Sequence, residues 1–118
     1  MTRRHATESD IVTQAMRDIP LALGGRCKVL RLNAGSAKNG VRGVPAGTPD
    51  ILVILQGGRC VWLEFKRDAD QDPSDAQIKW HKEARVLGHE VHTVWSVQDA
   101  VVLCRSAGLR AAVRAVAT

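Results

Sequence analysis

The sequence has no long hydrophobic run. No apolar stretch reaches the roughly 18 residues that a membrane-spanning helix needs, and the N-terminal residues MTRRHATESD lack the apolar centre of a signal peptide. We therefore expect a protein of the cytoplasm rather than of a membrane or a secretory route.

Cysteine and aromatic residues are scarce. The three cysteines, Cys27, Cys60 and Cys104, are odd in number, and none forms a CxxC pair, which indicates reduced thiols rather than a zinc site. Tyrosine is absent and there is one phenylalanine, which argues against an RNA-binding sheet with exposed aromatics. Nothing resembles a Ser-His-Asp triad, a P-loop or a dinucleotide-binding fingerprint.

Basic residues outnumber acidic ones. The chain has 17 Lys and Arg against 12 Asp and Glu, a formal net charge of +5, and a pI of about 9.6. Such a balance favours an acidic partner, nucleic acid first. The length of 118 residues and the absence of repeats or compositional breaks predict one domain over residues 1–118.

The hydrophobic periodicity predicts a mixed β-sheet flanked by helices, in the order α-β-β-β-α-β-α. Two capping boxes, Thr7 with Asp10 and Ser74 with Gln77, predict where two helices begin, and Pro20 is expected to kink or shorten the first. The expected helices are 8–23, 75–87 and 97–106, with a short terminal one possible in 109–117, and the expected strands are 27–32, 51–55, 60–67 and 90–95.

A glycine-rich loop, residues 33–49, follows the first strand. It carries Lys38 and Arg42 and no acidic residue before Asp50. Loops of this length in small domains commonly have a function, so we expect this one to contact phosphates rather than serve as a linker.

Charged residues lie on two strands that are otherwise apolar. Asp50 opens the run ILVIL, and Glu64 and Lys66 are two residues apart on the next strand. Since strand side chains alternate between faces, Glu64 and Lys66 point to one face and the apolar Leu63 and Phe65 to the other. The arrangement fits a structural salt bridge, a solvated sheet face, or a cation site made of hard oxygen ligands.

The turn between these strands decides whether Asp50 can join Glu64. A two-residue turn at Gly57-Gly58 would pair Asp50 with Phe65 and leave Asp50 on the wrong face. A shared site therefore predicts a three-residue loop, Gln56–Gly58, or a bulge near Asp50.

The spacing of Pro49-Asp50, thirteen further residues and Glu64-x-Lys66 resembles the motif of the PD-(D/E)xK nuclease superfamily. The finer resemblance is to the VRR-NUC family, the virus-type replication and repair nucleases, over about residues 7–96. Its matching elements are R-x-N-x-G at 31–35, G-x-P-D at 47–50, E-x-K at 64–66 and S-x-x-Q-x-x-W at 74–80. Small stand-alone members are typical of phages and bacteria, so a phage-encoded copy would act in the host cytoplasm.

The resemblance implies roles for individual residues. Asp50 and Glu64 would bind Mg²⁺ or Mn²⁺ together with the main-chain carbonyl of Phe65, and Lys66 would position or help to deprotonate the attacking water. The acidic residue that the family carries on its first helix is matched by Glu8, with Asp10 as the alternative. Gln77 matches a glutamine near the metal site, but it is also half of a capping box.

The resemblance also implies the substrate. We expect a metal-dependent, structure-selective DNA endonuclease, acting on branched or four-way-junction DNA in DNA repair, and working as a homodimer. A restriction-type or flap nuclease of the same fold is the alternative enzyme, and a catalytically silent DNA-binding module is the alternative of another class. The residues expected to contact the DNA backbone are Arg31, Asn33, Lys38, Arg42, Lys79 and Lys82, with Arg85 beside them on the second helix.

The remaining chemistry-bearing residues have structural interpretations. His89 and His92 are three apart on a strand and face opposite sides, so they cannot chelate one metal together. His81 is expected to be half-exposed on the second helix. The three tryptophans, Trp62, Trp80 and Trp95, are expected to be core residues rather than platforms for base stacking.

Overall fold

The computed structural model describes residues 7–32 and 43–117, with side chains as far as Leu109. Its helices are α1 (Glu8–Ala22), α2 (Asp75–Val86) and α3 (Val97–Ala117). Its strands are β1 (Cys27–Arg31), β2 (Ile51–Leu55), β3 (Cys60–Phe65) and β4 (Glu90–Val94), and a 3₁₀ turn, η2 (Gln56–Gly58), joins β2 to β3. The mixed α/β fold predicted from the sequence is confirmed.

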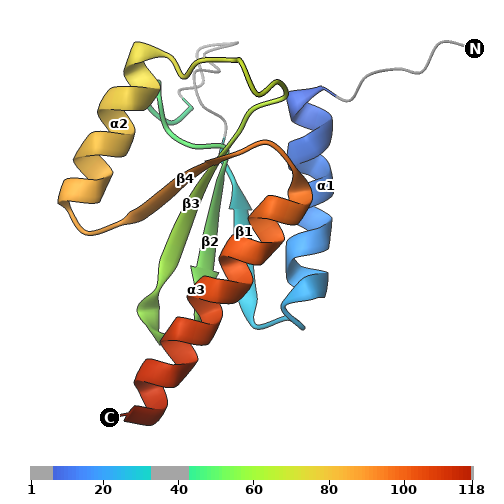
Figure 1. The fold of residues 1–118 in the computed structure, drawn as a ribbon, viewed down its shortest axis with the longest axis vertical. Coiled ribbons are helices and arrows are strands. Elements are labelled where there is room, and N and C mark those ends of the chain that lie inside the picture. The colour runs from blue at the N-terminus through green and yellow to red at the C-terminus, as the bar shows by residue number, and fades with distance from the viewer. Residues whose placement is uncertain (1–6, 33–42, 118) are drawn as a thin grey trace, which may run out of the picture.

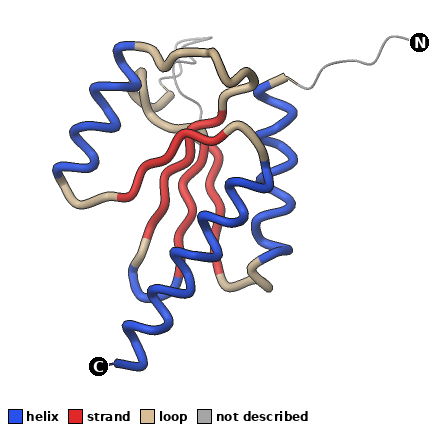
Figure 2. Tube along the Cα trace, in the orientation of Figure 1, coloured by secondary structure: helices blue, strands red, loops and turns tan. Residues whose placement is uncertain are grey.

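The four strands form one sheet in the order β1-β2-β3-β4 (Figure 1). The first three are antiparallel neighbours, and β4 runs parallel to β3. A parallel neighbour needs a crossover connection, and α2 makes it. Helices α1 and α3 pack against each other, while α2 lies apart from both, at the other side of the strands (Figure 2).

The hydrophobic core lies between the sheet and the pair α1 and α3. Alternate residues of the two central strands enter it, as period-two geometry requires. Val12, Ala15 and Ile19 supply the α1 side of the core, at helical spacing. The core residues of the other elements are Ile51, Val53, Leu55, Val61, Leu63, Phe65, Val94, Val97, Ala100, Cys104 and Ala107. The opposite face of the central strands is therefore left for α2 and for the charged residues.

Both predicted capping boxes are present. The Thr7 hydroxyl accepts a hydrogen bond from the Asp10 amide at 3.1 Å, and the Thr7 amide donates to Asp10 Oδ2 at 3.0 Å. The corresponding distances between Ser74 and Gln77 are 3.2 and 2.9 Å. These bonds satisfy amides that a helix start leaves without partners. Pro20 lies inside α1, which ends two residues later at Ala22.

The C-terminal part of the chain differs from the sequence prediction. Helix α3 is continuous from Val97 to Ala117, where a break after Ser106 was expected. Ala107 is fully buried in the core, so packing holds the helix through the next residue, Gly108, against a propensity cost of about 1 kcal/mol. Within the described ranges, no helix combines the length and hydrophobicity that crossing a bilayer requires.

The three cysteines are free thiols, as expected. The core placement predicted for Trp95 is wrong. Its side chain is 42% exposed, and its indole N–H donates to the carbonyl of Asp68 at 3.0 Å. Trp95 directly follows β4, and this hydrogen bond ties it to the polar segment after β3.

Gly47 holds the segment before Asp50 against α2. Its φ is +91°, and a β-carbon at this position would lie 2.2 Å from the carbonyl oxygen of Ala76. Only glycine can combine this left-handed conformation with such a close approach of two backbones. The glycine of the G-x-P-D motif thus has a packing reason.

Gly47→Ala should lower the free energy of unfolding by about 3 kcal/mol or more, since it adds a backbone clash to left-handed strain. Gly58→Ala is the matched control, because Gly58 has φ +72° but open space around its β-carbon position. It should cost only about 1–2 kcal/mol. Urea unfolding of the three proteins measures both values, and equal losses in the two variants would contradict the packing role of Gly47.

Candidate active site

The register of β2 and β3 brings two carboxylates to one face. Ile51 pairs with Leu63 and Ile54 with Cys60, and the loop between the strands is the three-residue turn Gln56–Gly58. The three-residue loop predicted from the sequence is confirmed. Continuing this register by one residue sets Asp50 opposite Glu64, on the face away from the core.

Asp50 is fixed by main-chain contacts on both sides. Its carboxylate Oδ2 accepts a hydrogen bond from the Phe65 amide at 2.8 Å, and its carbonyl accepts one from the Leu32 amide at 2.8 Å. The preceding Thr48 and Pro49 are buried. The carboxylate is thus tied directly to the strand that carries Glu64.

Glu64 is a buried carboxyl group in contact with Asp50. It is 3% exposed, and its Oε1 has no hydrogen-bond partner among the described residues. Burial, a side-chain hydrogen bond with Asp50 and the charges of Asp50 and Glu8 raise the pKa of Glu64 to about 9, while Lys66 acts in the opposite direction. In this state Glu64 keeps its proton at neutral pH, because two adjacent carboxylates cannot both be charged cheaply in a dry site.

Lys66 directly follows β3 and is 6% exposed. Its amide donates to the carbonyl of Val94 at 2.9 Å, which extends the pairing of β3 with β4. Its charge influences two groups: it lowers the pKa of Glu64 and contributes to lowering the pKa of His81 on α2. Lys66 therefore lies within electrostatic reach of both the carboxylate pair and the inner face of α2.

Glu8 approaches the same site from α1. It is the first residue of that helix, its Oε1 is buried without a partner in the described part of the chain, and its charge contributes to the raised pKa of Glu64. The stripe formed with Val12, Ala15 and Ile19 faces the sheet as expected. Asp10, the alternative, is exposed and serves as the acceptor of the Thr7 capping box.

These donors suit a hard divalent cation. Asp50 and Glu64 supply carboxylate oxygens, and the partnerless Oε1 atoms of Glu64 and Glu8 are buried acceptors of the kind that a cation satisfies. Within residues 7–32 and 43–109, no three His, Cys, Asp or Glu side chains are grouped closely enough to hold a metal alone. The pair fits Mg²⁺, which binds through one or two carboxylates and keeps other oxygen ligands.

A solved structure described as a VRR_NUC domain is similar to this chain. The match covers 85% of this chain and 97% of that one, with 28% identical residues and a TM-score of 0.63. No protein-family model matched the sequence, and no curated protein matched it either. The chain has the VRR-NUC fold. This structural match confirms the resemblance inferred from the motifs, and it supports the assignment of the chain to the VRR-NUC family.

Gln77, the glutamine of the motif S-x-x-Q-x-x-W, forms part of the N-terminal capping box of α2. The side-chain oxygen of Gln77 accepts the Ser74 amide hydrogen bond at 2.9 Å. Gln77 is nevertheless half-buried, and it shares a stripe of α2 with the buried His81 and Ala84. The same side chain therefore caps the helix at the end that packs against Gly47, three residues before Asp50.

His81 is placed differently from the sequence prediction. It was expected to be half-exposed but is 5% exposed, with a buried Nε2 that has no partner among the described residues. Burial, Arg85 and Lys66 lower its pKa. The spacing of Gln77, His81 and Ala84, four and then three residues, was the signal that could have identified this inner stripe.

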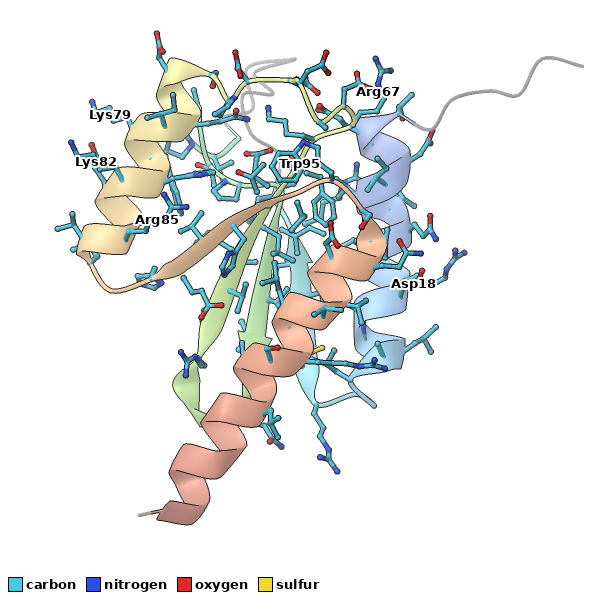
Figure 3. The ribbon with its side chains drawn as sticks, in the orientation of Figure 1. Asp18, Arg67, Lys79, Lys82, Arg85 and Trp95 are labelled. Carbon is cyan, nitrogen blue, oxygen red and sulfur yellow. The ribbon has the colours of Figure 1, made fainter. Side chains whose placement is uncertain are left out.

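The basic residues divide into three groups. Arg31 is held by α1, since its guanidinium donates to the hydroxyls of Thr13 and Ser9, each at 2.9 Å. Lys79 and Lys82 project from the side of α2 that faces away from the sheet (Figure 3). The other residues expected to contact DNA, Asn33, Lys38 and Arg42, lie outside the described residues.

Trp62, Trp80, His89 and His92 form structural contacts. Trp62 donates its indole N–H to His89 Nδ1 at 3.1 Å, and its ring packs edge-on against Trp80 with centroids 4.9 Å apart. His92 pairs instead with Glu90 at 2.9 Å. Both tryptophans are half-buried, so the Trp62–Trp80 pair joins α2 to the sheet.

The pKa of Glu64 makes stability depend on pH. Between its ordinary value of 4.5 and about 9, the folded state holds a proton that the unfolded state releases. Stability without metal should therefore fall as pH rises through this window. Glu64→Gln, which cannot titrate, should gain stability relative to the native protein across it.

Urea unfolding in EDTA at several pH values between 5 and 9 measures this difference. Glu83→Gln is the matched control, because Glu83 is exposed on α2, and its curve should stay parallel to that of the native protein. If the Glu64→Gln curve also runs parallel, Glu64 is not held protonated by its site.

Proposed function

We propose that this protein is a metal-dependent, structure-selective DNA endonuclease that hydrolyses phosphodiester bonds. The observation that carries the proposal is the buried contact between Asp50 and Glu64 with Lys66 beside it. A nuclease-type function is also what the VRR-NUC likeness supports. Burial of Glu64 against the half-buried carboxylate of Asp50 is unfavourable for the fold alone, so a functional reason is required.

Asp50, Glu64 and the carbonyl of Phe65 would hold Mg²⁺ or Mn²⁺, and Glu8 would add a further negative charge from α1. Such an ion polarises the phosphate and stabilises the charge that develops during in-line attack. The Phe65 amide keeps the Asp50 carboxylate oriented through its 2.8 Å hydrogen bond. Pre-set ligands of this kind avoid reorganisation at the moment of reaction.

Lys66 would act on the attacking water. An ammonium group beside a carboxylate can donate a hydrogen bond to water, orient it toward phosphorus and favour its deprotonation. Its place next to Glu64 along β3 puts this donor on the face that carries the carboxylates. Gln77, at the start of α2, is proposed to border the same site while it caps the helix.

The DNA would be bound mainly through its backbone. Lys79 and Lys82 on α2, with Asn33, Lys38 and Arg42 in the sequence between β1 and β2, offer donors without an evident device for reading bases. Arg31 would contribute through the position it holds at the N-terminal end of α1. Such contacts favour recognition of shape, and we propose branched or four-way-junction DNA.

Two alternatives use the same fold. A restriction-type or flap nuclease would share the chemistry and differ in the DNA that it cuts. A silent DNA-binding module would not need the buried carboxylate pair, whose cost to stability a silent copy could remove by substitution. The energetic cost of the pair therefore favours an active enzyme.

Asp50→Ala, Glu64→Ala and Lys66→Ala should each reduce cleavage by on the order of a thousandfold, since each removes a charge that acts in the transition state. Asp70→Ala is the control, because Asp70 is an exposed carboxylate between β3 and α2, and it should cleave normally. The assay is single-turnover cleavage of labelled junction, flap, single-stranded and duplex DNA in Mg²⁺, Mn²⁺ or EDTA.

DNA binding in EDTA separates chemistry from folding. Loss of the carboxylates should leave affinity unchanged or increased, because their repulsion of phosphate is relieved. A Lys66→Ala protein that cleaves at the native rate would remove the lysine from the mechanism.

Resolution of a four-way junction requires two paired cuts, so we propose a two-fold homodimer. The favoured surface is the outer side of α3, where Val102 and Leu109 are 60% and 67% exposed and lie seven residues apart on one stripe. Sedimentation at micromolar concentration should report a dimer. Leu109→Asp should give a monomer, and Leu87→Asp, at a 79% exposed position on α2, should not.

A native protein that sediments as a monomer, and that cuts flaps but not four-way junctions, would contradict the dimer and the junction substrate. The nuclease chemistry would stand in that case, because it depends on one copy of the carboxylate pair.

A further inference from the structure

A buried polar group on the inner side of α2, the His81 imidazole, lacks a partner among the described residues and lies within electrostatic reach of the Lys66 ammonium. The imidazole Nε2 of His81 is buried and makes no hydrogen bond to any described residue. The ammonium of Lys66, on a side chain that is 6% exposed, likewise makes no hydrogen bond or ion pair within the described part of the chain. A buried polar atom left unpaired is costly, so His81 Nε2 calls for a donor, and Lys66 is a cation near enough to supply one.

We propose that His81 is a positioning residue for Lys66: its neutral imidazole accepts a hydrogen bond from a bridging water to which the Lys66 ammonium donates, and this link aims the ammonium at the attacking water. The inference rests on the proposed nuclease function for its catalytic consequence. The contact itself does not depend on that function.

The placement of His81 on α2 supports the contact. His81 belongs to the inner stripe with Gln77 and Ala84, and it is next to Trp80, whose ring packs on Trp62 of β3. Lys66 is close enough to His81 to influence its titration. The packing of Trp80 on Trp62 thus brings the helix against the strand that leads to Lys66.

The charge state of His81 is the one that an acceptor needs. Burial and the two cations around it, Arg85 on its own helix and Lys66 from β3, lower its pKa. His81 is therefore neutral at the pH where the nuclease would work, and one ring nitrogen carries a lone pair. The guanidinium of Arg85 donates to the carbonyl of Val91 at 2.9 Å. The Lys66 ammonium makes no such bond to a described residue, which favours it as the donor.

The position of His81 also suits a residue that acts through Lys66 rather than on the substrate. Lys66 has three donors on a flexible stem, and the carboxylates of Glu64 and Asp50 alone would draw the ammonium toward themselves. An acceptor on the opposite side holds it between the carboxylate pair and α2. Loss of this acceptor should slow the chemical step without weakening DNA binding.

The first test is single-turnover cleavage by His81→Leu and His81→Gln. The leucine variant should lose about tenfold or more in rate, the effect of one hydrogen bond to a charged group, with DNA affinity unchanged. The glutamine variant keeps a neutral acceptor and should recover most of the rate. His89→Leu, at an exposed histidine that bonds to Trp62, is the matched control and should cleave normally.

The second test needs no activity. Nitrogen-15 NMR of the metal-free protein follows the His81 ring, and Lys66→Met should shift its Nε2 resonance and raise its pKa toward the ordinary value. Lys79→Met, which removes an exposed lysine from the same helix, should do neither. Should the native protein cleave no DNA with any metal, the proposed function fails while this experiment still decides the contact.

Three outcomes would overturn the inference. One is a His81→Leu enzyme with the native rate. Another is a His81→Gln enzyme as slow as the leucine variant with the same loss of thermal stability, which is the result of a merely structural role. The third is a His81 Nε2 resonance that is unchanged by Lys66→Met.

Discussion

The contact between Asp50 and Glu64 depends on the register of β2 against β3, and the rest of the site is arranged around it. A turn one residue shorter than Gln56–Gly58 would move Asp50 to the core face, because a single-residue slip reverses every side chain of a strand. With the register as it is, the Phe65 amide can bind Asp50, and Lys66 follows on the same face as Glu64. The length of this turn therefore determines both which residues enter the core and which carboxylates share the opposite face.

Without a bound metal, the contact between Asp50 and Glu64 lowers the stability of the folded protein. A carboxyl group with a pKa of about 9 in the folded state contributes less stability as pH rises, and its buried oxygen has no partner in the described residues. A divalent cation would reverse both effects by replacing the proton and satisfying the oxygen. The core on the other face, built from α1, α3 and the alternate residues of β2 and β3, supplies the stability that tolerates this cost.

The features predicted from the sequence are those that local chemistry decides. Capping boxes determined the starts of α1 and α2, and the need to bring Asp50 and Glu64 together predicted the three-residue turn. The inner face of α2 was missed because hydrophobicity alone directs Ile78, Val86 and Leu87 inward, whereas tertiary packing leaves these residues in solvent and buries a histidine. The uninterrupted α3 depends likewise on the burial of Ala107, a contact that the sequence does not show by itself.

Binding of Mn²⁺ measured by calorimetry in two buffers of different ionisation enthalpy tests the central claim most directly. At pH 7.5 the native protein should bind the ion and release about one proton per ion bound, since Glu64 must give up its proton to become a ligand. Glu64→Gln and Asp50→Asn should bind weakly and release none. Binding with no proton release, or equal binding by the native protein and both variants, would contradict a metal site built on this pair.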